Sequence, residues 1–136
     1  MIENDRSFTD PPAHPALPDR AQMGSTEAGR LEQLFKVLAN DTRLRLLHAL
    51  IRAGDLTVTQ LADAVGMRAS AVSNQLQRLS DRGVVASRRD GNRIWYRVSD
   101  PCVVGLIDLA WCLVEAPGQA PVEIRGPDGG QAAGTR

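Results

Sequence analysis

Two short amphipathic segments in tandem, each ending at a glycine, constrain the fold of this chain most strongly. The first begins at Thr57 and ends at Gly66, and the second continues to Gly83. At helical spacing they carry Val58, Leu61, Ala62, Val65, Ala71, Val72, Leu76 and Leu79. Glycine ends helices because it adopts the left-handed conformation that follows the last turn. Two short helices joined by a tight turn predict a helix-turn-helix unit.

Two further segments upstream show the same helical spacing. The first lies within residues 25–38, where Ser25 or Thr26 is the expected N-cap, and the second runs from Asn40 to Gly54. The faces that these helices are expected to bury hold Leu31, Leu34, Phe35, Leu38, Leu44, Leu47, His48 and Ile51. We therefore expect four helices in succession.

The pattern becomes strand-like in residues 84–88 and 93–98, which flank a turn containing Gly91 and predict a hairpin. Pro101 then begins a fifth helix that is expected to run to about residue 116, since proline is tolerated in the first turn of a helix. The expected fold is mainly α with a small β-hairpin, in the order α-α-α-α-β-β-α.

Both ends of the chain differ in composition from its middle. Residues 1–24 hold four prolines with almost no apolar periodicity, and residues 117–136 hold three prolines and five glycines, so we expect two flexible tails. The core must come from residues 25–116. A domain of that size often gains stability by dimerising.

Composition and motifs exclude several classes of protein. The acidic start has no basic or apolar signal region, and two cysteines cannot build a disulfide framework, so we expect a cytoplasmic protein. The apolar stretch 102–114 contains Asp108 and is shorter than the roughly 20 residues of a membrane helix, so no membrane partner is expected. The chain has no phosphate-binding glycine motif or nucleophile elbow, so we do not expect an enzyme.

Positive charge gathers in residues 68–97, although the whole chain has 16 basic and 16 acidic residues. That block holds seven arginines and two aspartates, a net charge of +5, which leaves −5 for the rest of the chain. A basic helix followed by a basic hairpin suits DNA, because guanidinium groups that contact phosphates release condensed counterions. The alternative is a solvated arginine-rich surface.

The residues expected to contact DNA lie on the second helix of the helix-turn-helix unit and on the hairpin. Amides can pair with adenine and guanidinium groups with guanine, so the polar face of this helix suits base edges in the major groove. The alternative is an ordinary polar surface helix. The expected contacts are Arg68, Ser70, Ser73, Asn74, Gln75, Gln77, Arg78, Arg88, Arg89, Asn92 and Arg93.

Four stretches together resemble the ArsR (ArsR/SmtB) family of bacterial winged-helix repressors. They read LFKVLANDTRLRLL (34–47), LADAVG (61–66), SAVSNQLQRL (70–79) and GNRIWY (91–96). The resemblance implies a homodimer through the first and last helices, the helix at 70–79 in the major groove, the hairpin as a wing along the backbone, and an inducer that weakens operator binding. Arg68 departs from the family, which has a small hydroxyl residue at the entry to this helix.

The fifth helix supports a dimer on physical grounds. It is apolar almost all round between residues 103 and 114, and such a helix needs burial on more than one side. A partner subunit is the simplest cover for so small a domain, the alternative being burial within one subunit. A two-fold dimer would present its two recognition helices to inverted-repeat half-sites of double-stranded operator DNA, about one helical turn apart.

The resemblance also indicates where an inducer could bind. One family site is absent because residues 57–59 carry no cysteine, but another matches Asp100 and Cys102 near the start of the last helix and Cys112 and Glu115 near its end. Thiolates and carboxylates are ligands for transition-metal or metalloid ions. The spacing is one residue shorter than in the family. Ten residues of helix rise about 15 Å, so a site that joins both cysteines must span the dimer.

The sequence thus predicts a DNA-binding transcriptional repressor that releases its operator when a metal or metalloid ion acts on the fifth helix. Three alternatives stay open. The thiols could instead form a redox or persulfide switch in the same fold. Both cysteines could be small buried hydrophobes. The fold could also serve as an interaction module that does not bind DNA.

Overall fold

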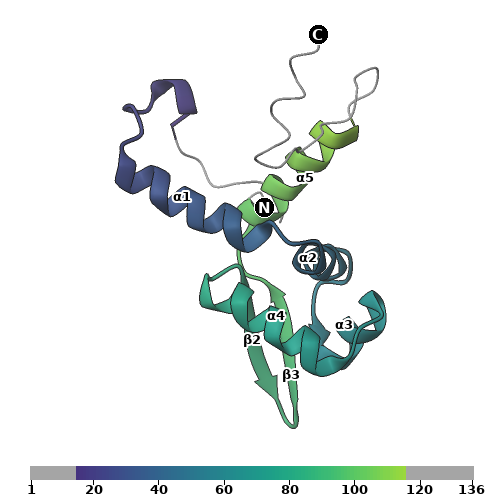
Figure 1. The fold of residues 1–136 in the computed structure, drawn as a ribbon. Helices are drawn as coiled ribbons and strands as arrows, with labels where there is room; N and C mark the ends of the chain where they lie inside the picture. Colours follow the sequence, from purple (N-terminus) through teal and green to yellow (C-terminus); the bar gives the residue numbers. More distant parts are fainter. Residues whose placement is uncertain (1–14, 116–136) are drawn as a thin grey trace, which may run out of the picture. The chain divides into compact units, whose positions relative to one another are not determined.

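The computed structural model describes residues 15–115, and its elements follow the predicted order (Figure 1). They are η1 (Leu17–Asp19), α1 (Ser25–Leu38), α2 (Asp41–Ala53), β1 (Leu56–Thr57), α3 (Val58–Val65), α4 (Ala69–Asp81), β2 (Val85–Asp90), β3 (Arg93–Val98) and α5 (Pro101–Glu115). The four helices, the hairpin and the fifth helix are thereby confirmed. The 3-10 turn η1 and the strand β1 were not predicted, because two or three residues are too few to show a period. Of the two predicted tails, only residues 15–24 lie within the described part of the chain.

The core lies where α2, α3, α4 and the start of β2 meet. Its most deeply buried side chains are Leu46, Leu47, Leu50, Leu61, Val72, Leu76, Leu79 and Val84. The predicted faces of α3 and α4 are confirmed, but the predicted face of α2 is wrong in part. Leu44 is 39% exposed and His48 is also exposed, whereas Leu46 and Leu50 are buried. The leucines of α2 spread over a wide arc of the helix surface, so periodicity alone admits two overlapping faces.

The helices begin and end at residues with the expected capping chemistry in α2 and α3. The side chain of Asn40 caps α2 by accepting a hydrogen bond from the Arg43 backbone N–H. Thr57 Oγ1 accepts a hydrogen bond from the Gln60 backbone N–H at 3.2 Å, and Gln60 Oε1 accepts one from the Thr57 backbone N–H at 2.9 Å. Gly66 ends α3 in the left-handed region at φ +71°. Gly66 thus ends α3 directly before the turn that leads to α4.

The start of α1 differs from the prediction. Its N-cap is Gly24, whose backbone N–H donates to Glu27 Oε1 at 2.9 Å. Ser25 and Thr26 are the first two helical residues, so neither is the N-cap. The Glu27 side chain therefore makes one of the two hydrogen bonds of a capping box, and the other is missing because glycine has no side chain.

The sheet has three antiparallel strands in the order β1-β3-β2. The hairpin pairs Val85 with Val98 at its base and Asp90 with Arg93 at its tip. The short β1, which directly precedes α3, pairs with the middle of β3, Leu56 lying opposite Tyr96. The hairpin is therefore joined to the helix-turn-helix unit by backbone hydrogen bonds, and its tip extends beyond the helices as a wing (Figure 1).

Helix α5 spans two compact units, Met1–Gly105 and Leu106–Arg136. Val103 and Val104 are buried within the first unit. In the second unit, large apolar side chains are exposed, among them Leu109 at 67% and Trp111 at 61%. Among the described residues, no helix is both long enough and apolar enough to cross a membrane.

Candidate nucleic-acid interface

Helix α4 separates its apolar and polar residues onto opposite faces. Val72, Leu76 and Leu79 are fully buried and anchor the helix to the core. The residues with exposed side chains on the other side are Ser70, Ser73, Asn74, Gln77 and Arg78. Gln77 Nε2 donates to Asp81 Oδ1 at 2.8 Å along this face. Five of the residues predicted to contact DNA thus share one exposed surface of α4.

Gln75 lies apart from that exposed surface. Its side chain is half-buried, and its Oε1 accepts a hydrogen bond from Nη1 of Arg43 at 2.8 Å. Arg43 was not predicted as a functional residue, because its partner stands 32 residues further along the chain. No local pattern in the sequence signals this contact.

The N-terminus of α4 has no side-chain cap. Arg68 is the N-cap residue, with extended backbone, and its side chain makes no capping hydrogen bond. The first N–H groups of a helix have no intrahelical partner and carry partial positive charge. An exposed arginine beside these N–H groups makes this end of α4 suitable for an anion such as a DNA phosphate.

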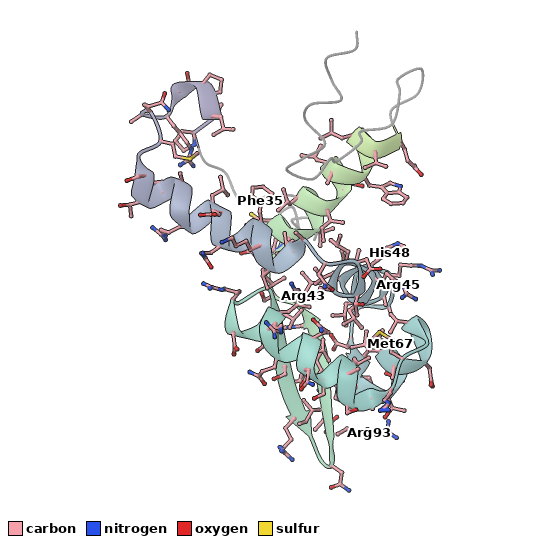
Figure 2. All side chains as sticks on the ribbon, viewed as in Figure 1. Phe35, Arg43, Arg45, His48, Met67 and Arg93 are labelled. Atoms are coloured by element: carbon pink, nitrogen blue, oxygen red, sulfur yellow. The ribbon has the colours of Figure 1, made fainter. Side chains whose placement is uncertain are left out.

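The wing presents basic and polar side chains at its tip. Arg89, Asn92 and Arg93 are all exposed (Arg93 is labelled in Figure 2). The strands are joined by the two-residue loop Gly91-Asn92, in which Gly91 has φ +66°. This positive φ favours glycine and permits the tight turn that brings the three side chains to one end of the hairpin.

Arg88 differs from the other arginines of the wing because its guanidinium group has partners. Its Nη2 lies 3.3 Å from Asp55 Oδ2, its Nη1 lies 3.9 Å from Asp90 Oδ2, and its Cζ lies 5.7 Å from the centre of the Trp95 ring. Asp55 belongs to the loop before β1, so this contact also holds the wing against the helix-turn-helix unit. The predicted DNA contact of Arg88 would have to compete with these partners.

A basic pocket of about 380 Å³ adjoins the C-terminal part of α4. It is lined by Gln33, Lys36, Val37, Arg43, Arg78, Asp81 and Arg82. Arg82 Nη2 donates to Gln33 Oε1 at 2.9 Å, which joins the end of α4 to α1. Four basic residues and one acidic residue extend the positive surface of α4 towards α1.

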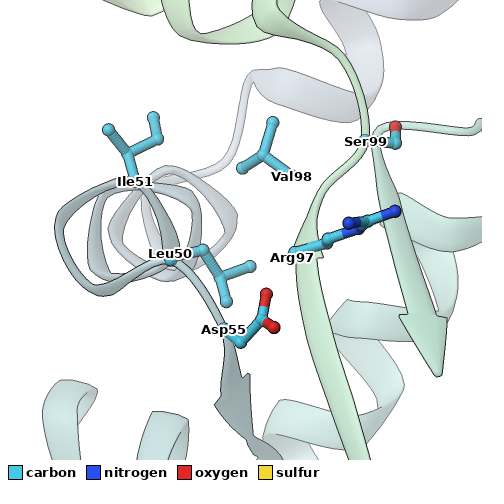
Figure 3. Close-up of a pocket in the computed structure, with 7 residues that line it drawn as sticks. Leu50, Ile51, Asp55, Arg97, Val98 and Ser99 are labelled. Carbon is cyan, nitrogen blue, oxygen red and sulfur yellow. The ribbon is translucent and has the colours of Figure 1, made fainter. Parts of the chain in front are cut away.

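A second pocket, of about 320 Å³, lies on another part of the unit (Figure 3). Its lining residues are Leu50, Ile51, Gly54, Asp55, Arg97, Val98 and Ser99. None of these is a predicted DNA contact or a predicted ligand of an ion. Its one acidic side chain, that of Asp55, already pairs with Arg88.

The predicted ion ligands fall into two pairs. Asp100 Oδ1 accepts a hydrogen bond from the Cys102 backbone N–H at 2.8 Å, which places this pair together at the start of α5 with Cys102 half-buried. Cys112 and Glu115 are exposed near the other end of the helix, in the second unit. Across residues 15–115, no three histidine, cysteine, aspartate or glutamate side chains gather as a metal site.

Comparison with known proteins places these features in a family. The profile of the MarR family matches residues 40–93, from the N-cap of α2 to the first residue of β3. The probable mercury resistance operon repressor of Streptomyces lividans is 38% identical over 93 residues, 68% of this chain and 74% of that protein. The HTH-type transcriptional regulator NmtR of Mycobacterium tuberculosis is 41% identical over 90 residues, 66% of this chain and 74% of that protein.

Two solved structures agree with the fold. The AntR antimony-specific transcriptional repressor is 60% identical, with a TM-score of 0.67, and the match covers 75% of this chain and 92% of that one. A homodimeric winged helix-turn-helix DNA-binding domain from Mycobacterium bovis, described as a possible ArsR-family regulator, is 34% identical with a TM-score of 0.58 over 68% of this chain and 87% of that one. These relatives are transcriptional regulators and not enzymes, which agrees with the prediction from the sequence. The chain therefore belongs to the ArsR family of winged helix-turn-helix transcriptional repressors.

Proposed function

We propose that this chain represses transcription as a homodimer on double-stranded operator DNA with inverted-repeat half-sites, and that it releases the operator when a soft metal or metalloid ion binds the thiols of α5. Residues 25–116 would form the DNA-binding and dimerisation domain, between two tails. The observation that carries the DNA-binding part is the division of α4 into a fully buried apolar face and an exposed face of hydroxyl, amide and guanidinium groups.

In this arrangement α4 lies in the major groove. Asn74, at the centre of the exposed face, is placed to pair with a base edge, since a side-chain amide can bond adenine through both its oxygen and its nitrogen. Arg89 and Arg93 at the wing tip contact phosphates of the neighbouring backbone, and Arg68 does so at the N-terminus of α4. Phosphate contacts set the register of the protein, and base contacts give specificity.

The homodimer would be formed by α1 and α5. On α1, Leu31 is 40% exposed and Phe35 is 48% exposed; on α5, Leu109 and Trp111 are exposed to 67% and 61%. Apolar side chains of this size on two helices are the kind of surface that a second subunit covers. The relative from Mycobacterium bovis, which is a homodimer, supports an assembly of two subunits.

The donor set of α5 suits a soft ion that bridges two subunits. The two cysteines lie ten positions apart, a rise of about 15 Å along one helix. An antiparallel pairing of two α5 helices would bring Cys102, with Asp100, next to Cys112 and Glu115 of the partner subunit. Thiolates favour soft ions, and the 60% identity to an antimony-specific repressor makes trivalent antimony the first ion to test.

Release would follow from a change in how the two subunits are held. An ion bonded to both α5 helices fixes their relative position. If that position differs from the one in the DNA complex, the two α4 helices no longer match both half-sites. A coupling free energy of about 1–3 kcal/mol between ion and operator gives a 5- to 150-fold loss of affinity.

The first experiment is a fluorescence-anisotropy titration of the reduced protein on a labelled duplex from its own promoter. It is repeated with trivalent antimony and arsenic, with cadmium and mercuric ions, and with hydrogen peroxide or a persulfide donor. We expect antimony to release the duplex from the native protein but not from Cys102→Ser or Cys112→Ser. Release by the oxidant or persulfide alone would assign a thiol switch, and an unchanged response in both serine variants would remove the thiols from sensing.

Mixed dimers test whether the site spans two subunits. A dimer of one Cys102→Ser subunit and one Cys112→Ser subunit keeps both thiols at one of its two sites if each site joins Cys102 of one subunit to Cys112 of the other. The mixture should then regain part of the response that both homodimers have lost. If it regains none, the ion does not join these two cysteines across the dimer.

A further inference from the structure

One side chain joins the end of α1 to the middle of the recognition helix. Arg43, in the first turn of α2, donates from Nε to the Val37 carbonyl at 2.5 Å and from Nη2 to the Lys36 carbonyl at 3.5 Å. From Nη1 it donates to Gln75 Oε1 on α4 at 2.8 Å. Figure 2 labels Arg43 between the end of α1 and α4. Three elements thus meet at a single guanidinium group.

The end of α1 offers two carbonyl groups to this side chain. Of its last four carbonyls, that of Phe35 accepts from the Ala39 N–H and that of Leu38 from the Asn40 N–H. The carbonyls of Lys36 and Val37, which have no further turn of helix to pair with, are bonded by Arg43. They also lie at the negative end of the helix dipole, which favours a cation.

Arginine suits this place better than lysine would. Its planar guanidinium group offers five N–H donors in a fixed fork, so it can bond acceptors on two helices at once. Hydrogen bonds from a charged donor are stronger than neutral ones. Arg43 is half-buried, which reduces the screening of these bonds by solvent. The link therefore constrains the position of α4 relative to α1.

The same bond changes what Gln75 can offer to DNA. Arginine only donates, so the amide oxygen of Gln75 must face Arg43 and its amide nitrogen must face away. A bidentate contact with adenine needs both the oxygen and the nitrogen. Asn74 and Gln77 on either side are exposed, whereas Gln75 is half-buried. Gln75 is therefore suited to holding α4 in place and poorly suited to reading a base.

We propose that Arg43 and Gln75 are positioning residues for operator binding, which fix the recognition helix to α1 and thereby set the spacing of the two recognition helices in the dimer. This inference rests on the proposed function, because α1 sets that spacing only if it belongs to the dimer interface. The link makes the protein selective for one distance between half-sites, and it does not determine which bases are preferred.

The test compares Arg43→Gln, Gln75→Met and the double variant with Arg52→Gln, a matched control that removes the same charge from an exposed position on α2. Affinity is measured for the native operator, for operators with the half-sites one base pair closer or further apart, and for a set of single-base substitutions. We expect each single variant to bind the native operator about tenfold more weakly and the double variant to be no worse than the weaker single one. All three variants should lose the discrimination between half-site spacings and keep the native base preference.

Two results would overturn the proposal. In the first, Gln75→Met loses its preference for one base at a single position of the operator, whereas Arg43→Gln keeps its preference for the native half-site spacing. The losses of affinity in the two single variants then add in the double variant. The second is native spacing selectivity in all three variants. If Arg43→Gln does not fold by circular dichroism, Arg43→Lys and Gln75→Met carry the test, since lysine keeps the charge but lacks the fork. A native protein that binds no operator would contradict the proposed function and not this link.

Discussion

Arginine side chains in this protein differ in their surroundings although they carry the same charge. Arg93 is exposed at the wing tip and has no partner among residues 15–115. Arg88 pairs with Asp55, 33 residues away, and Arg43 with Gln75, 32 residues away. The charge pattern of the sequence locates the basic block of residues 68–97. It does not reveal which guanidinium groups are already engaged, because the partners are brought together only by folding.

At the scale of single residues, we expect Asn74→Ala and Arg93→Ala to weaken DNA binding in different ways. Asn74→Ala should cost about 1–3 kcal/mol on the operator and relax the preference at one base pair. Arg93→Ala should weaken binding to all sequences alike and lower the slope of log affinity against log salt by about 1, because one phosphate contact is lost.

Anisotropy titrations at several salt concentrations, on the operator and on a scrambled duplex, measure both effects. The reverse pattern, with relaxed base preference in Arg93→Ala, would contradict the assignment of α4 to the major groove and of the wing to the backbone.

Helices and strands could be predicted from the sequence where several apolar residues recur at a regular spacing. In α3 and α4 the apolar residues share one face, so the buried face follows from the sequence. The ends of α3 also carry recognisable caps, at Thr57 and Gly66, which set its bounds. In α2, leucines on a wide arc left the buried face undecided until α3 and α4 packed against it. The strand β1 exists only because β3 lies beside it.

At the scale of elements, we expect Gly66→Ala to lower the free energy of unfolding by about 1–2 kcal/mol. No atom lies within 4 Å of an added Cβ at this position, so the cost is the left-handed backbone at φ +71° and not a clash. The matched control is Gly29→Ala in α1, which also has open space around it. There the helix propensity of alanine should raise stability by up to about 1 kcal/mol.

Urea unfolding followed by circular dichroism measures both changes at one protein concentration. Equal effects of the same sign in the two variants would show that backbone conformation at Gly66 does not decide where α3 ends.

At the scale of the whole molecule, apolar side chains of α1 and α5 are exposed within the part of the chain that the structure describes. Phe35, Leu109, Trp111 and Leu113 are 48%, 67%, 61% and 66% exposed. A domain of this size has few other residues with which to cover them. Dimerisation would therefore stabilise the fold itself, in addition to placing two copies of α4 on the DNA.

At this scale, we expect the Tm of the native protein to rise with protein concentration, since association couples to folding. Leu109→Lys should shift the protein towards monomer in sedimentation velocity, because it places a charge in the proposed interface. Leu17→Lys, at a leucine that is 72% exposed on η1, is the matched control and should leave the dimer intact. A Tm that does not depend on concentration, with an unchanged sedimentation coefficient for Leu109→Lys, would contradict the α5 interface.

The sequence by itself determined the order of the five helices and the hairpin, the helix-turn-helix unit, the basic wing and the family, because these depend on local periodicity, capping residues and a distinctive set of motifs. Tertiary structure alone decided that Arg43 bonds both α1 and Gln75, that Arg88 is held by Asp55 and Trp95, and that His48 faces solvent. Each of these depends on residues that are distant in the chain and adjacent in space, and such contacts leave no periodic signal. The physical reason is that secondary structure follows from neighbours along the chain, whereas the partner of a side chain is set by packing.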